Sequence, residues 1–166
     1  MLASGRLPRV SSGPDPLHPT AARFREALLA DGVDVEVRML PGSARTAAEA
    51  AESIGVELGQ IVKSLVFVRG EEPVVVLCAG DRRVDAERLG LTPASPDVVR
   101  EATGYAIGGV PPFGHARAHE TLIDESLQRF DVVWAAAGHP RAVFEISVGD
   151  LIAAVPEADV TDVTEG

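Results

Sequence analysis

The chain has 166 residues and a mass of 17.4 kDa, which favours a single domain with its own hydrophobic core. Hydrophobic residues make up 46% and charged residues 24%, an ordinary globular composition. The formal net charge of -10 argues against non-specific binding to nucleic acid or to a membrane surface. A single cysteine, Cys78, excludes an internal disulfide framework and any multi-cysteine metal site, and it favours a reducing, cytoplasmic compartment.

The negative charge is unevenly distributed along the chain. Residues 145–166 contain acidic side chains and no basic one, so much of the excess is local. A basic patch around Lys63, Arg69, Arg82 and Arg83 is therefore compatible with an RNA partner.

Three segments differ in composition. Residues 1–16 are rich in Ser, Gly and Pro and predict a flexible N-terminal arm without a secretory signal. Residues 17–156 carry the periodic patterns of a folded domain, and residues 157–166 form an acidic tail. No apolar stretch is long enough to span a membrane.

The first predicted elements alternate between helix and strand. Thr20 is expected to cap a helix that runs to about Ala30, with Asp31-Gly32 ending it. Alternating apolar residues predict a half-buried strand over 33–39. The pair Thr46 and Glu49 has the spacing of a capping box that opens a short helix, which Gly55 ends.

The remaining pattern predicts a strand-rich domain. Strands are expected over 61–68, 74–79, 105–107, 121–124, 132–137 and 143–146. Helices are expected over 84–89, after Ser95-Pro96, and over 147–155. Neighbouring strands separated by helices favour a single α+β domain around one sheet that can curl into a barrel.

The familiar catalytic signatures are absent from the sequence. It contains no P-loop, no dinucleotide-binding glycine pattern, no zinc-protease motif and no nucleophile-elbow serine. Most large enzyme classes are therefore excluded.

Lys63 is unusual because it lies in an otherwise apolar strand. Strand geometry places it on one face with Leu65 and Phe67, whereas Ser64 points to the other face. This rules out a Ser64–Lys63 catalytic dyad. Lys63 either extends along apolar surface to reach solvent or provides a cation for an anionic ligand.

The segment from Gly104 to Gly114 is too rich in glycine and proline for an ordinary strand. Such a rigid loop can direct several backbone N–H groups at one point, as an oxyanion hole requires. The alternative is a tight structural turn between strands.

The other polar candidates are weaker. His115, His119 and His139 lack the carboxylate pattern of a metal site, so no metal is expected. Asp124 could be a catalytic carboxylate, or it could cap the turn that follows its strand.

Several of these segments together resemble the YbaK/EbsC family of free-standing aminoacyl-tRNA deacylases, which is similar to the editing insertion of bacterial prolyl-tRNA synthetase. The matching segments, in the family's order, are Val62-Lys-Ser-Leu-Val-Phe-Val68, Ala79-Gly-Asp-Arg82, Gly104-Tyr-x-x-Gly-Gly-Val-Pro-Pro-Phe-Gly114, Thr121-x-Ile-Asp124 and Ala136-Ala-Gly138. The resemblance covers roughly residues 17–155.

The resemblance implies a mixed, mostly antiparallel, barrel-like sheet flanked by helices. It also implies hydrolysis of the ester between an amino acid and the 3′ end of tRNA, without a cofactor. Lys63 matches the lysine expected to hold the terminal adenosine and phosphate, and Gly108 and Gly109 match the catalytic loop. The expected substrate-binding residues follow in that loop and in a later turn: Val110, Pro111, Pro112, Phe113, Gly138 and His139.

His139 departs from the commonest family pattern, which leaves its role open. The expected partners are the 3′ end of a mischarged tRNA and an aminoacyl-tRNA synthetase, not DNA or a membrane. Lysine is too basic for a general base without strong desolvation, so Lys63 is assigned to anchoring. The alternative function is a non-catalytic module of the same fold that binds a nucleotide or tRNA end.

Overall fold

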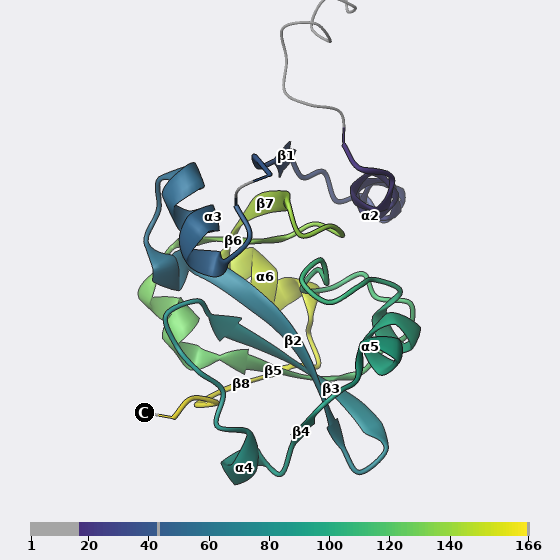
Figure 1. Cartoon of the computed structure of the whole chain (residues 1–166), viewed down its shortest axis with the longest axis vertical. Helices are drawn as coiled ribbons and strands as arrows, with labels where there is room; N and C mark the ends of the chain where they lie inside the picture. The colour runs from purple at the N-terminus through teal and green to yellow at the C-terminus, as the bar shows by residue number, and fades with distance from the viewer. Residues whose placement is uncertain (1–16, 43, 166) are drawn as a thin grey trace, which may run out of the picture.

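An eight-stranded sheet organises residues 17–42 and 44–165, the parts of the chain that this computed structural model describes (Figure 1). The arm predicted over 1–16 lies outside the described residues. None of the helices in the described ranges is long and apolar enough to cross a membrane.

The helices largely follow the predicted capping signals. Thr46 and Glu49 form the predicted capping box, in which the Thr46 hydroxyl accepts the Glu49 N–H at 3.1 Å. The first helix is capped by His18 and not by Thr20, and it starts one residue before the predicted cap. The described helices are α2 (Pro19–Ala30), α3 (Ala47–Ile54), α4 (Ala86–Leu89), α5 (Pro96–Thr103) and α6 (Val148–Ala154), with 3-10 turns η1 (Leu58–Gln60) and η2 (Glu125–Arg129).

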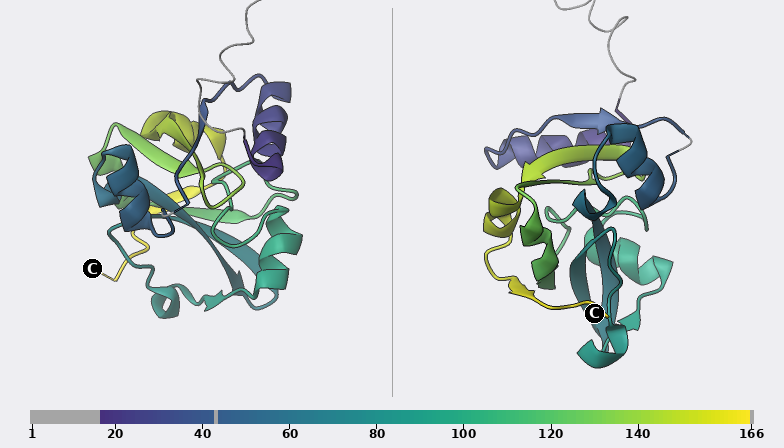
Figure 2. Two further views of the ribbon diagram at one scale, coloured as in Figure 1. Left: turned by 45° about the horizontal axis from the view of Figure 1, so that its top comes forward. Right: turned by 90° about the vertical axis from the view of Figure 1, so that its left-hand side faces the viewer.

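The strands form a mixed sheet in the order β1-β7-β6-β2-β3-β5-β8, and β4 pairs with β2. Four pairings are antiparallel and three are parallel. The strands are β1 (Val37–Met39), β2 (Ile61–Arg69), β3 (Glu72–Ala79), β4 (Thr92–Pro93), β5 (Glu120–Asp124), β6 (Val132–Ala136), β7 (Ala142–Ser147) and β8 (Asp159–Thr161). The right-hand view of Figure 2 shows the sheet curving from β1 and β7 at the top to the yellow β8 at the lower left.

This curvature encloses the main hydrophobic core. Phe24 of α2, Val99 of α5 and Leu151 of α6 belong to the same buried cluster as Leu77 of β3 and Phe144 of β7. The predicted α+β domain with a mixed, barrel-like sheet flanked by helices is confirmed. The barrel stays open, because β1 and β8 stand at the two ends of the strand order.

Two predicted strands differ from the structure. The strand predicted over 33–39 is reduced to β1, because only residues 37–39 pair with β7. The strand predicted over 105–107 is wrong. Gly104 and Gly108 both have positive φ, at 87° and 90°, and the Gly109 N–H closes a turn onto the Ala106 carbonyl at 2.9 Å.

Residues 159–165 pack against the domain. β8 pairs in parallel with β5, and the nearby Val163 is fully buried. The Glu165 N–H then donates to the Arg83 carbonyl at 3.0 Å. Val163 lies in a second cluster with Cys78, whose thiol pKa is raised to about 12 by burial. Cys78 is therefore a structural, unreactive thiol.

Candidate functional site

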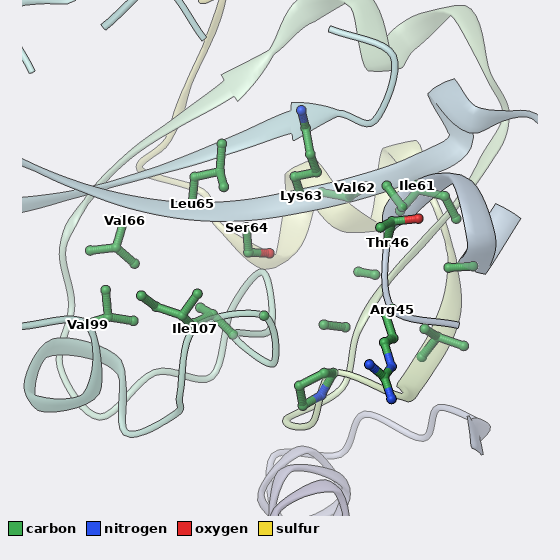
Figure 3. A pocket seen from close by; sticks show the side chains of 18 of the residues that line it. Arg45, Thr46, Ile61, Val62, Lys63, Ser64, Leu65, Val66, Val99 and Ile107 are labelled. Carbon is green, nitrogen blue, oxygen red and sulfur yellow. The ribbon is translucent and has the colours of Figure 1, made fainter. Parts of the chain in front are cut away.

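A cavity of about 530 Å³ opens beside β2 (Figure 3). It is bounded by β2 and β6, by the start of α3, and by the turn around Gly108. Its walls are mostly apolar and include Val62, Val66, Val99, Val110, Trp134 and Val143. An apolar enclosure with a few polar groups is the usual form of a small-molecule site.

The charged residues that line this cavity are both basic. Among the described residues, its lining contains Arg45 and Lys63 and no carboxylate. This is notable in a chain with a net charge of -10. The Glu49 carboxylate accepts the main-chain N–H of Arg45 at 2.9 Å as part of the α3 cap. The cavity therefore favours an anionic ligand over a cationic one.

Lys63, the only lysine in the chain, lies at the rim of this cavity. Figure 3 shows its side chain on the opposite side of β2 from Ser64, as predicted. Its ammonium group donates to the Arg82 carbonyl at 2.7 Å. In this structure the ammonium group thus points to the loop after β3, and its remaining hydrogens are free for another acceptor.

The loop after β3, whose Arg82 carbonyl accepts the Lys63 ammonium group, is held in place by hydrogen bonds. The Arg82 N–H donates to the Ala79 carbonyl at 3.0 Å. The Asp81 carboxylate accepts two hydrogen bonds from the Arg129 guanidinium, at 2.9 and 3.1 Å, which also holds the Asp81 pKa below its usual value. A bidentate pair of this kind fixes orientation as well as distance, so the Arg82 carbonyl is well positioned.

Asp124 serves as a cap in this arrangement. It is fully buried, and its carboxylate accepts the N–H groups of Ala79 at 3.0 Å and Ser126 at 2.8 Å. It thereby joins the end of β3 to the start of η2. Of the two roles left open for Asp124, the geometry supports the structural one.

The glycine-rich loop approaches the cavity through Gly108 and Val110, which both belong to its lining. Gly109 packs behind them, where an added Cβ would lie 2.9 Å from the His139 Cα. Gly138 makes a similar close approach, because its Cβ would lie 2.7 Å from the Thr20 carbonyl oxygen. These two glycines let the loop, the 138–140 turn and α2 touch through their backbones.

The other predicted site residues lie around the cavity without forming its wall. Pro111 and Pro112 are buried, and the Pro111 carbonyl accepts the Nε2–H of His115 at 2.6 Å. His139 stacks on His18 with ring centroids 4.0 Å apart, while its neighbour Pro140 lines the cavity.

Phe113 faces a different part of the molecule. Its ring packs against Phe24 and Phe144, with centroid distances of 6.2 and 5.9 Å. With Gly114 it lines a separate groove of about 990 Å³. That groove is predominantly acidic, and its charged residues are Asp31, Asp34, Glu36, Arg38, Glu145 and Asp150.

Most of the lining residues were not predicted as site residues, among them Arg45, Thr46, Trp134 and Pro140. The capping box did signal a helix start at Thr46, but the sequence held no indication that this start faces β2. Within the described ranges, no group of three His, Cys, Asp or Glu residues is placed to hold a metal ion.

Comparison with known proteins identifies the family. The model of the aminoacyl-tRNA editing domain matches residues 42–154, which include every lining residue of the cavity. The chain belongs to this family. Its editing domain is 39% identical to "Uncharacterized protein YwhH" of Bacillus subtilis (strain 168) over 116 residues, which cover 66% of this chain and 74% of that protein.

Two further relatives carry functional names. "Putative Cys-tRNA(Pro)/Cys-tRNA(Cys) deacylase EbsC" of Enterococcus faecalis (strain ATCC 700802 / V583) is 31% identical over 110 residues, covering 61% of this chain and 67% of that protein. The crystal structure of "a putative trans-editing enzyme for prolyl tRNA synthetase" superposes with a TM-score of 0.85 and 46% identity. That match covers 91% of this chain and all of the other. The resemblance found in the sequence is thus confirmed at the level of family and fold.

Proposed function

We propose that this protein is a trans-editing deacylase of the cytoplasm, which hydrolyses the ester between a wrong amino acid and the 3′ end of tRNA. The observation that carries the proposal is the apolar cavity whose charged lining residues are Arg45 and Lys63, in a chain of the editing-domain family. A 3′-terminal aminoacyl nucleotide combines the two features that such a cavity suits, an anionic phosphate and a small organic group.

The proposed division of roles follows the lining. Lys63 holds the phosphate and terminal adenosine with the ammonium hydrogens that the Arg82 carbonyl leaves free, and Arg45 adds a second cation in the cavity lining. The apolar wall takes the amino-acid side chain. Gly108 and Val110 bring main-chain N–H groups to the ester, and Gly109 maintains the turn that presents them.

The chemistry required is modest. A water molecule adds to the ester carbonyl, the bond from the acyl carbon to the ribose oxygen breaks, and a proton from the water passes to that oxygen. The α-ammonium group already activates the ester. One oxyanion donor contributes about 2.7–4 kcal/mol to such a step, so main-chain donors and an anchored substrate suffice without a catalytic triad.

The proposed biological need is a second selection step. A synthetase distinguishes substrates that differ by one methylene by only about 1–3 kcal/mol, which leaves mischarged tRNA to be removed. The names of EbsC and of the trans-editing structure point to tRNA(Pro) carrying a small amino acid as the first substrate class to test.

The test is release of labelled amino acid from Ala-, Cys- and Ser-tRNA(Pro), with Thr-charged noncognate tRNA as a further substrate. We expect hydrolysis of one or two substrates by the wild-type protein and a loss of roughly 10- to 100-fold in Lys63→Ala, from the loss of a charge-assisted contact. Arg69→Ala is the matched control, because Arg69 is another cation of β2 but pairs with Glu120 away from the cavity.

The outcomes separate the two candidate functions. Turnover that is lost in Lys63→Ala and kept in Arg69→Ala supports the deacylase. If no substrate is hydrolysed while the tRNA 3′ end still binds, the protein is a binding module of the same fold.

A further inference from the structure

The edge of β2 that faces the cavity is only partly paired. β6 pairs with Ile61 and Val62, and β4 pairs with Phe67 and Val68. Between these two pairings, residues 63–66 have no neighbouring strand on this side within the described chain. On the other side, β3 pairs with β2 from Val62 to Arg69. The cavity lies beside this gap, since residues 63–66 all line it.

The register identifies which main-chain groups open into the gap. Val68 stands opposite Pro73 of β3, and proline has no N–H, so this is a non-hydrogen-bonded pair. Every second residue from there, including Ser64 and Val66, therefore directs its N–H and C=O away from β3. In agreement, the Val66 carbonyl accepts the Ala94 N–H at 3.3 Å.

Ser64 is thus the residue with both main-chain groups facing the gap and no partner for either among the described residues. Its hydroxyl oxygen is buried without a hydrogen-bond partner in the same set. Ser64 as a whole is nevertheless partly exposed. The exposed surface of Ser64 therefore belongs to its other atoms, and the residue lines the cavity.

We infer that Ser64 binds the aminoacyl group of the substrate as it would bind the opposite residue of a neighbouring antiparallel strand. Its main-chain N–H donates to the ester carbonyl, and its own carbonyl accepts a hydrogen bond from the α-ammonium group. This inference rests on the proposed function and adds the contact that recognises the reacting atoms.

The geometry matches an α-amino ester. In a hydrogen-bonded strand pair, the N–H and C=O of one residue face the C=O and N–H of its partner. An aminoacyl ester carries the same donor and acceptor on one α-carbon, so it can form the same two bonds. Its side chain then projects out of the plane of the sheet, on the side where Figure 3 shows Val66, Val99 and Ile107.

This pairing serves both binding and catalysis. The contact to the α-ammonium group is the same for every α-amino acid, so selectivity is left to the apolar wall. The contact from the Ser64 N–H strengthens as negative charge develops on the carbonyl oxygen when water adds.

The test is Ser64→Pro, which removes this N–H. The change is compatible with the strand, because the Ser64 N–H is not used in pairing and Lys63 before it is already extended. Ser64→Ala keeps both main-chain groups and is the matched variant. We expect Ser64→Pro to deacylate about 100- to 1,000-fold more slowly than Ser64→Ala. Rates within twofold of each other, with both variants folded by circular dichroism, would overturn the inference.

A binding measurement covers the case in which Ser64→Pro fails to fold. The probes are 3′-deoxy-3′-(L-alanylamino)adenosine, which has an amide in place of the ester, and its N-acetyl derivative, which lacks the ammonium group. Calorimetry should show at least tenfold tighter binding of the free amine by the wild-type protein. Equal binding of the two probes, or binding of neither, contradicts the inference.

These results are distinguishable from failure of the proposed function. If the wild-type protein hydrolyses no ester but prefers the free amine, the deacylase is wrong and the pairing with Ser64 stands. If it hydrolyses esters and shows no preference, the deacylase stands and the pairing is wrong.

Discussion

The side chain of His115 holds the glycine-rich loop in place by a hydrogen bond. Its Nε2–H donates to the carbonyl of Pro111, and the preceding residue, Val110, lines the cavity. Burial lowers the pKa of the imidazole, so the folded protein favours its neutral form. The unfolded chain takes up this proton at higher pH than the folded one does.

Stability should therefore depend on pH through His115. Its contribution is fully present above the unfolded imidazole pKa, near 6.5, and is lost as the pH falls through the lower folded value. Urea unfolding between about pH 5 and 8 should show a shallower decrease toward acid pH in His115→Gln, whose amide can still donate to Pro111.

Some acid sensitivity should remain in that variant, because burial, His18 and Arg141 also lower the pKa of His139. Identical pH profiles for the wild-type protein and His115→Gln would contradict this account of the imidazole.

At the scale of elements, α3 depends on its N-terminal cap. The Thr46 hydroxyl accepts the Glu49 N–H, and the Glu49 carboxylate accepts the Thr46 N–H at 3.0 Å. The same turn places Arg45 and Thr46 at the cavity. The capping box thus connects helix stability with the shape of the site.

Thr46→Ala should lower the free energy of unfolding by about 1 kcal/mol, because it leaves the Glu49 N–H without its capping acceptor. Chemical denaturation measures the change. Thr46→Ser retains the hydroxyl and should recover most of the loss, so equal destabilisation by Ser and Ala would show that the methyl group, and not the cap, is responsible.

Local signals in the sequence predicted most helices and the central hairpin. Caps at Thr46, Ser95 and Ser147 are formed by neighbouring residues, and β2 and β3 are apolar runs joined by a short turn. Capping and turn chemistry act over a few residues, which a sequence displays directly.

Contacts between distant segments could not be predicted in this way. The parallel pairing of β2 with β6 joins Val62 to Ala135, and no local pattern fixes such a partner. The main-chain N–H and C=O of Ser64 are left unpaired because β6 pairs with β2 only at Ile61 and Val62. The failed strand at 105–107 has a local cause, because two left-handed glycines flank it and override its β-favouring composition.

At the scale of the whole molecule, the C-terminal segment closes one edge of the sheet. β8 covers β5, and Val163 inserts fully into the cluster that surrounds Cys78. The Glu165 N–H reaches Arg83, next to the residue that accepts Lys63. The end of the chain therefore supports the loop beside the cavity.

Val163→Ala should cost about 2 kcal/mol of unfolding free energy, because two buried methyl groups are removed and the cluster relaxes only in part. Val33→Ala is the matched control, since Val33 is 39% exposed. Thermal or urea unfolding of the two variants measures the difference, and similar values would show that this segment contributes little to the fold.

Because the sequence contains a single lysine, that one side chain can be labelled for NMR. Reductive methylation with ¹³C-formaldehyde modifies amines, and this sequence offers one side-chain amine, that of Lys63, besides the amino terminus. Its methyl resonance would report on one ammonium group at the rim of the cavity, beside the Arg82 carbonyl, without resonances from other lysines. Occupancy of the cavity could then be followed by NMR in the natural sequence, with no engineered label.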